Sequence, residues 1–348
     1  MRASALKLFL YCCFVVGTPF YCAEASDEQD LAALELEALL REKIIPSNVL
    51  GTHTHMKGEW MIGYQYSFMD MKQLADGTQK LSPADVLADF NVTPTAMQMQ
   101  MHMFHVMYAP SDDLTLFAMA GYQMKSMDHL AFTGAEFTTR SNGFSDVKIR
   151  GLYHLYRKRF DAHRVIFKAA ISLPTGSITK QDFLANAAMG LRQLPYPMQI
   201  GSGTYDLIPG LKYVGTGDKN AWGADLDLTL RLGKNKNDYA LGNIFEANIW
   251  YRHQLNPWLA PFLQLKYTAV GNVNGADTSL MPVAVPTNDP ARYGYRRLNL
   301  QVGMNIFLQG ALEGNKIALE ASQPLYQSVN GPQLRAQWLF RGGWQWAF

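Results

Sequence analysis

The chain ends with Trp338-Leu-Phe-Arg-Gly-Gly-Trp-Gln-Trp-Ala-Phe348. All five aromatic residues of this stretch have even numbers, and Arg341, Gln345 and Ala347 stand between them. In an extended strand, successive side chains point to opposite faces, so one face of this segment is strongly aromatic. The segment therefore predicts a β-strand with an aromatic face, either in a membrane barrel or at the end of a soluble sandwich or barrel.

The beginning of the sequence favours the membrane barrel. Arg2 and Lys7 precede an apolar run from Leu8 to Val16, and Ala23-Glu-Ala25 offers a small-residue cleavage site. The run is too short to cross a bilayer, so residues 1–25 read as a secretory signal peptide. A closing strand with an aromatic face and a terminal Phe also resembles the signature that ends bacterial outer-membrane β-barrels. We therefore expect Sec export to the bacterial outer membrane, with membrane lipid as a partner.

Composition excludes several classes of function. The cysteines Cys12, Cys13 and Cys22 all precede the predicted cut, which leaves no thiol for disulfides, metal sites or nucleophiles. The formal charge is +2, and removing Arg2, Lys7 and Glu24 leaves +1, so nothing indicates nucleic acid as a partner. After the signal peptide, no apolar stretch is long enough for a membrane helix. A barrel is compatible with this, because only every second residue of its strands meets lipid.

From Trp60 onward the sequence repeats with a period of two. The strand near Trp222 illustrates it, with Leu226, Leu228 and Leu230 opposed by Asp225 and Asp227. Similar rows predict twelve strands, an even number that suits a single-chain bacterial barrel. The predicted connections also alternate between short turns and longer loops, three of which are long: 72–94, 174–200 and 271–292. We thus predict an all-β protein, an antiparallel transmembrane β-barrel of about twelve strands over residues 58–348.

A different segment precedes the barrel. Residues 27–43 carry leucines at helical spacing among acidic residues. We expect residues 26–57 to form a short periplasmic helix and linker, which either packs at the barrel mouth or binds a periplasmic partner through residues 27–43. The sequence does not decide whether this segment enters the barrel.

Four short motifs resemble those of a known family. They are Gly143-Phe-Ser-Asp-Val-Lys148, Ser172-Leu-Pro-Thr-Gly-Ser177, Gly203-Thr-Tyr-Asp-Leu-Ile-Pro-Gly210 and Pro324-Leu-Tyr-Gln-Ser-Val-Asn-Gly-Pro-Gln333. They are similar to motifs of the outer-membrane, channel-like proteins of the MetA-pathway phenol-degradation family. The resemblance covers roughly residues 60–348. It implies a twelve-stranded barrel that transports small hydrophobic solutes, and it assigns no site residues.

Methionine is concentrated in one part of the chain. Of 17 methionines, 12 lie between Met56 and Met127, and five of the eight histidines lie between His53 and His129. One face of the predicted second strand is an unbroken row, which we expect to face the lumen because Phe104 and Val106 mark the opposite face as lipid-facing. With neighbouring strands it predicts a lumen or solute-binding wall of Met97, Met99, Met101, Met103, His105, Met107, Met119, Met127 and His129.

Two interpretations of this wall remain open. Methionine is a flexible apolar filler that suits a lumen for hydrophobic or aromatic solutes crossing by passive diffusion. Thioethers and imidazoles are also soft ligands, so the wall is a candidate for binding or transporting copper or silver as Cu(I) or Ag(I). For that alternative the candidate metal ligands are His53, His55, Met56, Met101, Met103, His105 and Met107. No other cofactor is expected.

Catalysis is the remote alternative. Some outer-membrane barrels are hydrolases with Ser and His on the outer wall, but this sequence has no Gly-x-Ser-x-Gly, and no serine accompanies His102 on its strand. Without a nucleophile beside a base, we expect a channel and not an enzyme, and we assign no catalytic residue.

Overall fold

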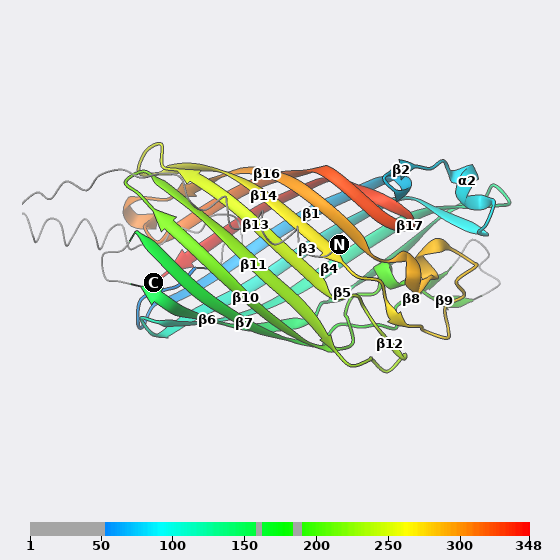
Figure 1. Ribbon diagram of the computed structural model, residues 1–348, viewed down its shortest axis with the longest axis horizontal. Helices are drawn as coiled ribbons and strands as arrows, with labels where there is room; N and C mark the ends of the chain where they lie inside the picture. The colour runs from blue at the N-terminus through cyan, green and yellow to red at the C-terminus, as the bar shows by residue number, and fades with distance from the viewer. Residues whose placement is uncertain (1–52, 158–161, 184–189) are drawn as a thin grey trace, which may run out of the picture. The chain divides into compact units, whose positions relative to one another are not determined.

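The computed structural model describes residues 53–157, 162–183 and 190–348. These residues form a closed antiparallel barrel of strongly tilted strands (Figure 1), in which pairing of the last strand with the first completes the wall. In chain order the wall strands are β1 (Trp60–Gly77), β3 (Val92–Ser111), β4 (Leu114–Ala131), β5 (Glu136–Phe144), β6 (Val147–Arg157), β7 (His163–Leu173), β10 (Tyr205–Thr216), β11 (Asn220–Leu232), β13 (Ile244–His253), β14 (Leu259–Val270), β16 (Tyr295–Phe307) and β17 (Asn315–Ala347).

Strand β17 crosses the wall twice, and we call each such crossing a leg of the wall. Its residues up to Val329 pair with β16, and those from Gln333 onward pair with β1. The chain reverses between them, where Gly331 has a φ of +81° that favours glycine. Strands β5 and β6 both pair with β4 and form one leg. Counted in this way, the described part of the wall has twelve legs, as the sequence predicts.

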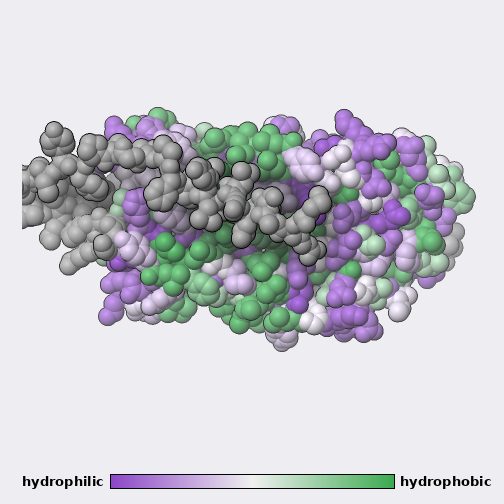
Figure 2. All heavy atoms as spheres, in the orientation of Figure 1, coloured by the Kyte–Doolittle hydropathy of each residue, from purple (hydrophilic) through white to green (hydrophobic). Residues whose placement is uncertain are grey.

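The two faces of the barrel are inverted relative to a soluble barrel. The predicted apolar rows, such as Leu226 and Leu228 of β11, lie exposed on the outside, together with Trp338, Phe340 and Trp346 of the final strand. Figure 2 shows hydrophobic residues around the middle of the visible outer face and more hydrophilic ones toward both ends. Polar side chains are buried inside instead. An apolar belt around a polar interior is the arrangement of a transmembrane β-barrel.

The two ends of the barrel differ in their connections. Short links after β3, β10, β13 and β16 lie at one end, which we call the turn end and which holds the C-terminus in Figure 1. The opposite loop end carries several small elements (Figure 1). They are β2 (Gln79–Lys80), α2 (Pro83–Leu87), β8 (Gln181–Phe183), β9 (Leu191–Gln193), η3 (Tyr196–Met198), β12 (Tyr239–Ala240), β15 (Asn274–Gly275), η4 (Pro286–Asn288) and η5 (Pro290–Arg292). In outer-membrane barrels the short turns are periplasmic.

One predicted loop has wrong boundaries. The sequence predicts a loop over residues 72–94, but β1 continues to Gly77 and β3 begins at Val92. The extension of β1 pairs with β17 and β2, and its Leu74 packs against Val86 and Phe90 around the short helix α2. Long-range pairing and packing make this stretch a strand although its sequence does not alternate. Within the described residues, no helix is long and apolar enough to cross a membrane. The predicted signal peptide and the helix at 27–43 lie outside the described residues.

Candidate functional site

The middle of the lumen contains a cavity of about 520 Å³. Methionines from β3 and β4 line one side of it, and charged side chains from β6 to β17 line the other. We call the inward-facing methionines of β1, β3 and β4 the Met wall. We call the opposite set the charged wall, and it consists of Lys148, Arg150, Lys168, Asp206, Lys212, Asp225, Asp227, Arg231, Glu246, Lys266, Glu320 and Arg341.

The predicted solute-binding residues of the Met wall occupy three different levels. At the level of the cavity, Met101, Met103 and Met119 line the open space, as does Phe117. Toward the loop end, Met97 and Met127 are buried against Leu194 and Met198. Toward the turn end, Met107 is buried in a cluster with Met61, Phe117, Leu152 and Ile166. Only the middle level of the predicted wall therefore faces the cavity.

The remaining members of the predicted wall lie outside the cavity lining. His105 sits over Gly63, where an added Cβ would lie 2.4 Å from the His105 ring, and Gln345 Nε2 is 3.4 Å from its Nε2 atom. His129 is buried near the loop end with Thr139 Oγ1 at 3.0 Å, and its ring stacks on Phe137. Met99 is half-buried on the same inward row of β3 as His105.

Residues 53–57 lie at the turn end, on the inner side of the wall. The His55 backbone N–H donates to Thr115 Oγ1 of β4 at 3.0 Å, and Thr54 Oγ1 is 2.8 Å from His154 Nε2 of β6. Both wall partners face inward, so residues 53–57 enter the barrel mouth. The rest of the predicted segment 26–57 lies outside the described residues. Met56 is exposed there.

The two histidines of this segment lie next to each other. The ring centroids of His53 and His55 are 4.5 Å apart, and His55 Nδ1 lies 3.2 Å from the Glu59 carboxylate. Burial lowers the pKa of His55, and Glu59 acts in the opposite direction. Across the described ranges, no group of three or more His, Cys, Asp or Glu side chains is placed to hold a metal ion. The predicted ligands are thus divided between the turn end, the His105 site and the cavity.

A loop from the loop end folds inward and bounds the cavity. Tyr196, Pro197, Gln199 and Ile200 contribute to its lining. Lys125 of β4 donates to the backbone carbonyls of Pro197, at 2.9 Å, and Gln199, at 2.6 Å. Met198, within the same loop, is completely buried and packs against Met97 and Met127 of the Met wall. A charged hydrogen-bond donor and an apolar contact together fasten this loop to the barrel wall.

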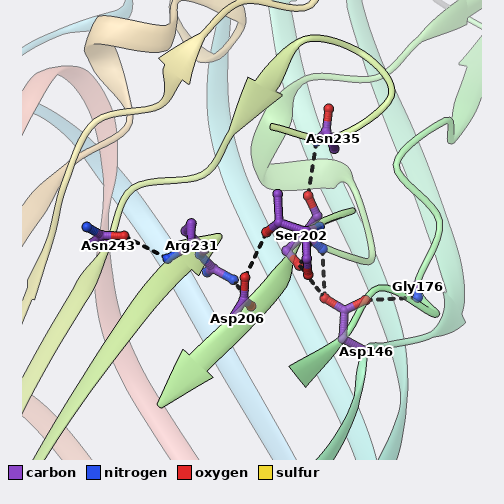
Figure 3. A network of polar contacts seen from close by, with 8 residues as sticks. Asp146, Gly176, Ser202, Asp206, Arg231, Asn235 and Asn243 are labelled. Atoms are coloured by element: carbon purple, nitrogen blue, oxygen red, sulfur yellow. Dashed lines mark hydrogen bonds and ion pairs between the residues drawn. The ribbon is translucent and has the colours of Figure 1, made fainter. Parts of the chain in front are cut away.

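A polar network fastens the following residues of the loop (Figure 3). The Asp146 carboxylate accepts hydrogen bonds from the Gly176 backbone at 2.9 Å and from both the backbone N–H, at 2.8 Å, and the hydroxyl, at 2.7 Å, of Ser202. Asn235 Nδ2 donates to the Ser202 carbonyl at 3.0 Å. Asp146 lies where β5 gives way to β6, so the interruption of that leg supplies the acceptor that orders the loop.

Most residues of the charged wall form ion pairs. Lys168 of β7 is almost completely buried, and its Nζ lies 3.0 Å from Asp225 and 2.6 Å from Asp227 of β11. Gly210 makes room for this cluster, because a Cβ there would lie 2.5 Å from Asp227 Oδ1. Other pairs join neighbouring or nearby strands in the same way, namely Lys212–Asp225, Arg150–Asp227, Lys266–Glu246, Arg231–Asp206 and Arg341–Glu320. Pairing offsets much of the cost of burying these charges.

Only part of this charged wall is predictable from the sequence. Asp225 and Asp227 alternate visibly on one strand, but their partner Lys168 is distant in the sequence. The inward loop is also missed, although Leu194-Pro-Tyr-Pro-Met-Gln-Ile200 is an apolar run that is unusual for a solvent-exposed loop. That run is the signal from which the insertion was predictable.

The outer wall bears on the hydrolase alternative. His102 of β3 lies on the outer face, and its Nδ1 is 2.8 Å from the Tyr64 hydroxyl of β1. The ring partners of His102 are Tyr64 and Tyr66. These contacts are those of an aromatic surface cluster and do not include a serine nucleophile.

Similarity to known proteins is found among solved structures. No protein-family model matches the sequence, and no curated protein matches it. The chain is similar to the COG4313 outer membrane channel from Pseudomonas putida F1, with 14% identity, a TM-score of 0.61, and coverage of 88% of this chain and 100% of that one. A Pseudomonas aeruginosa FadL homologue also matches, at 10% identity and a TM-score of 0.43 over 87% of this chain and 94% of that one.

The first of these likenesses supports an outer-membrane barrel fold. It leaves the resemblance to the MetA-pathway family as an expectation, because no family model matches. The second likeness carries no further argument. The fold is therefore that of an outer-membrane β-barrel.

Proposed function

We propose that this protein is an outer-membrane channel through which a small hydrophobic or aromatic solute passes by passive diffusion. The observation that carries the proposal is the cavity in mid-lumen, which has thioethers and a phenyl ring on one side and paired charges on the other. Small-molecule sites typically combine apolar walls with a few fixed polar groups. The COG4313 protein, which has a similar fold, is an outer membrane channel. No feature of the described residues indicates energy coupling.

The two walls favour an amphipathic solute over a purely apolar one. An aromatic ring packs well against Met101, Met103 and Met119, because thioethers make favourable contacts with aromatic rings. A polar substituent on the same solute then faces the charged wall, where it replaces hydrogen bonds to water. The loop at residues 194–204 bounds the cavity on the loop-end side, so we expect passage to involve its displacement from Lys125.

Uptake of benzoate into proteoliposomes tests this proposal. Met103→Trp fills the cavity from the Met wall and should reduce uptake about tenfold or more, since the indole occupies the volume that the solute needs. Met281→Trp makes the same exchange at a residue exposed in an outer loop and should leave uptake unchanged. Equal uptake by both variants and the unmodified protein would contradict the proposed path.

A soft-metal channel is the second candidate. The observation that favours it is that three thioethers, those of Met101, Met103 and Met119, line the same cavity. Titration of the purified barrel with Ag(I) should show saturable binding that is lost when all three are replaced by Leu, with Met281→Leu as the control. Zn(II) should not compete. Retained Ag(I) binding in the triple variant would exclude this site.

A further inference from the structure

Among the described residues, two buried cations in the turn-end half of the lumen have no hydrogen-bond or ion-pair partner. Arg252 of β13 and Lys316 of β17 are 8% and 5% exposed, whereas their neighbours Tyr251 and Ile317 are exposed on the outer face. Both cations therefore point into the barrel. Neither belongs to the lining of the mid-lumen cavity or to the charged wall.

Their hydrogen-bonding groups are unused. Nε and Nη1 of Arg252 and Nζ of Lys316 are buried and make no hydrogen bond. No ion pair found among the described residues includes either side chain, while Lys168, Arg231 and Arg341 of the charged wall are all paired. An ionised group buried without a partner is costly, so the site is incomplete without a compensating anion.

The surroundings bring these two groups to one site. Arg252 lies opposite Phe262, Phe262 opposite Gly303, and Lys316 opposite Phe307, so Asn305 stands between them on the inward row of β16. Asn305 is fully buried, and neither its Nδ2 nor its Oδ1 has a partner. The charges of Arg252 and Lys316 are close enough to act on each other.

Other charged groups lie near this level of the lumen. The charge of Lys316 also acts on His105 of the same wall. Glu320, four residues further along β17, holds the nearest carboxylate on that strand, with one oxygen paired to Arg341 and the other buried without a hydrogen bond. The level of Arg252 and Lys316 therefore has an excess of positive charge, and donors outnumber acceptors.

We propose that Arg252, Lys316 and Asn305 form an anion-binding site for a small carboxylate or inorganic oxyanion. The guanidinium offers a permanent charge and unused N–H donors at Nε and Nη1, and the lysine adds a point charge. The amide of Asn305 supplies a further donor. Binding at this site requires no transport, so the proposal stands apart from the proposed channel function.

Thermal unfolding of the full chain in a neutral detergent tests the site. Sodium acetate and sodium phosphate are titrated against sodium chloride at equal ionic strength. Occupation of the site should raise Tm saturably, by about 3 °C at saturation, because the anion binds only the folded state. A response to acetate alone identifies a carboxylate site, and a response to phosphate alone identifies an oxyanion site.

Variants separate a specific site from a general salt effect. Arg252→Gln and Lys316→Gln should abolish the anion-dependent rise, and Arg252→Lys should weaken binding about tenfold because it keeps the charge and loses the guanidinium donors. Lys236→Gln removes a positive charge from an exposed outer loop and should keep the full response. Identical curves for acetate, phosphate and chloride, or a full response in Arg252→Lys and Lys316→Gln, would overturn the proposal.

Discussion

The Met wall and the charged wall face the same lumen but are held together differently. Toward the loop end and toward the turn end, methionines of the Met wall are buried by other apolar side chains. Of the Met wall, only Met101, Met103 and Met119 line the cavity. The charged wall is held by ion pairs that link strands, with Lys168 at the centre of the pairs with Asp225 and Asp227. Apolar contacts tolerate changes in shape, whereas buried charges tolerate no loss of a partner.

This difference assigns separate tasks to the two walls. The Met wall anchors the inward loop at the loop end and fills the lumen at the turn end, and it leaves a soft surface between them. The charged wall fixes the polar side of the cavity in one arrangement. The comparison can be tested by removing one contact at a time.

The largest effect is expected from Lys168→Met. It leaves Asp225 and Asp227 buried without their shared cation and should lower the free energy of unfolding by about 3–5 kcal/mol. Urea unfolding in detergent measures this change. Lys236→Met, at an exposed position, serves as the control and should leave the stability unchanged. Equal stability of the two variants would mean that the charged wall is not held by its ion pairs.

Two truncations compare positions within the lumen. Met198→Ala should destabilise the barrel by about 2–5 kcal/mol, because the fully buried side chain leaves a hole between the loop and the Met wall. Met101→Ala only enlarges the existing cavity and should cost less than about 1 kcal/mol. The same unfolding measurement compares both. A larger cost at Met101 would show that the cavity level is packed in solution.

Lys125→Met tests the fastening of the inward loop. Loss of the ammonium leaves the Pro197 and Gln199 carbonyls without their donor and should cost about 1.5–3 kcal/mol. Because the loop bounds the cavity, single-channel conductance in a planar bilayer should rise. Lys80→Met, at an exposed position of the loop end, should change neither property. Unchanged conductance would indicate that the loop does not limit passage.

The smallest effect concerns pH at the turn end. Burial lowers the pKa of His55 below its ordinary value of 6.5, so the docked segment favours the neutral ring. The stability that His55 contributes is present above pH 6.5 and is lost as the pH falls below it, despite the opposing Glu59 carboxylate. Hydrogen exchange of residues 53–57 should therefore be faster at pH 5 than at pH 7.5 after correction for the intrinsic rate. His55→Gln should remove this difference, and its persistence would point to His53 or His154.

The two walls also differ in how much of each can be predicted from the sequence. Alternation in rows such as Leu226 to Leu230 is a local property, so strand positions and the leg count are predictable from it. Alternation does not say which face is outward; the predicted signal peptide and the aromatic final strand favour the apolar face. The inward direction of the methionine row on β3 follows from the same rule. The rule does not predict which of these methionines are buried and which line the cavity. Burial of Met97 and Met127 depends on Met198, which belongs to a loop distant in the sequence.

Sequence alone therefore determined the barrel and the positions of its Met-rich strands, since a period of two is written in neighbouring residues, and the predicted signal peptide with the aromatic final strand favoured the inverted faces. Only the tertiary structure decided which of those methionines meet open space, which cations are paired, and that residues 53–57 enter the mouth. Those features depend on closure of the wall, which brings β17 beside β1 and sets side chains from distant strands opposite one another. The physical reason is that alternation fixes the face of each residue, whereas contact across a lumen depends on register and on loops that the period does not encode.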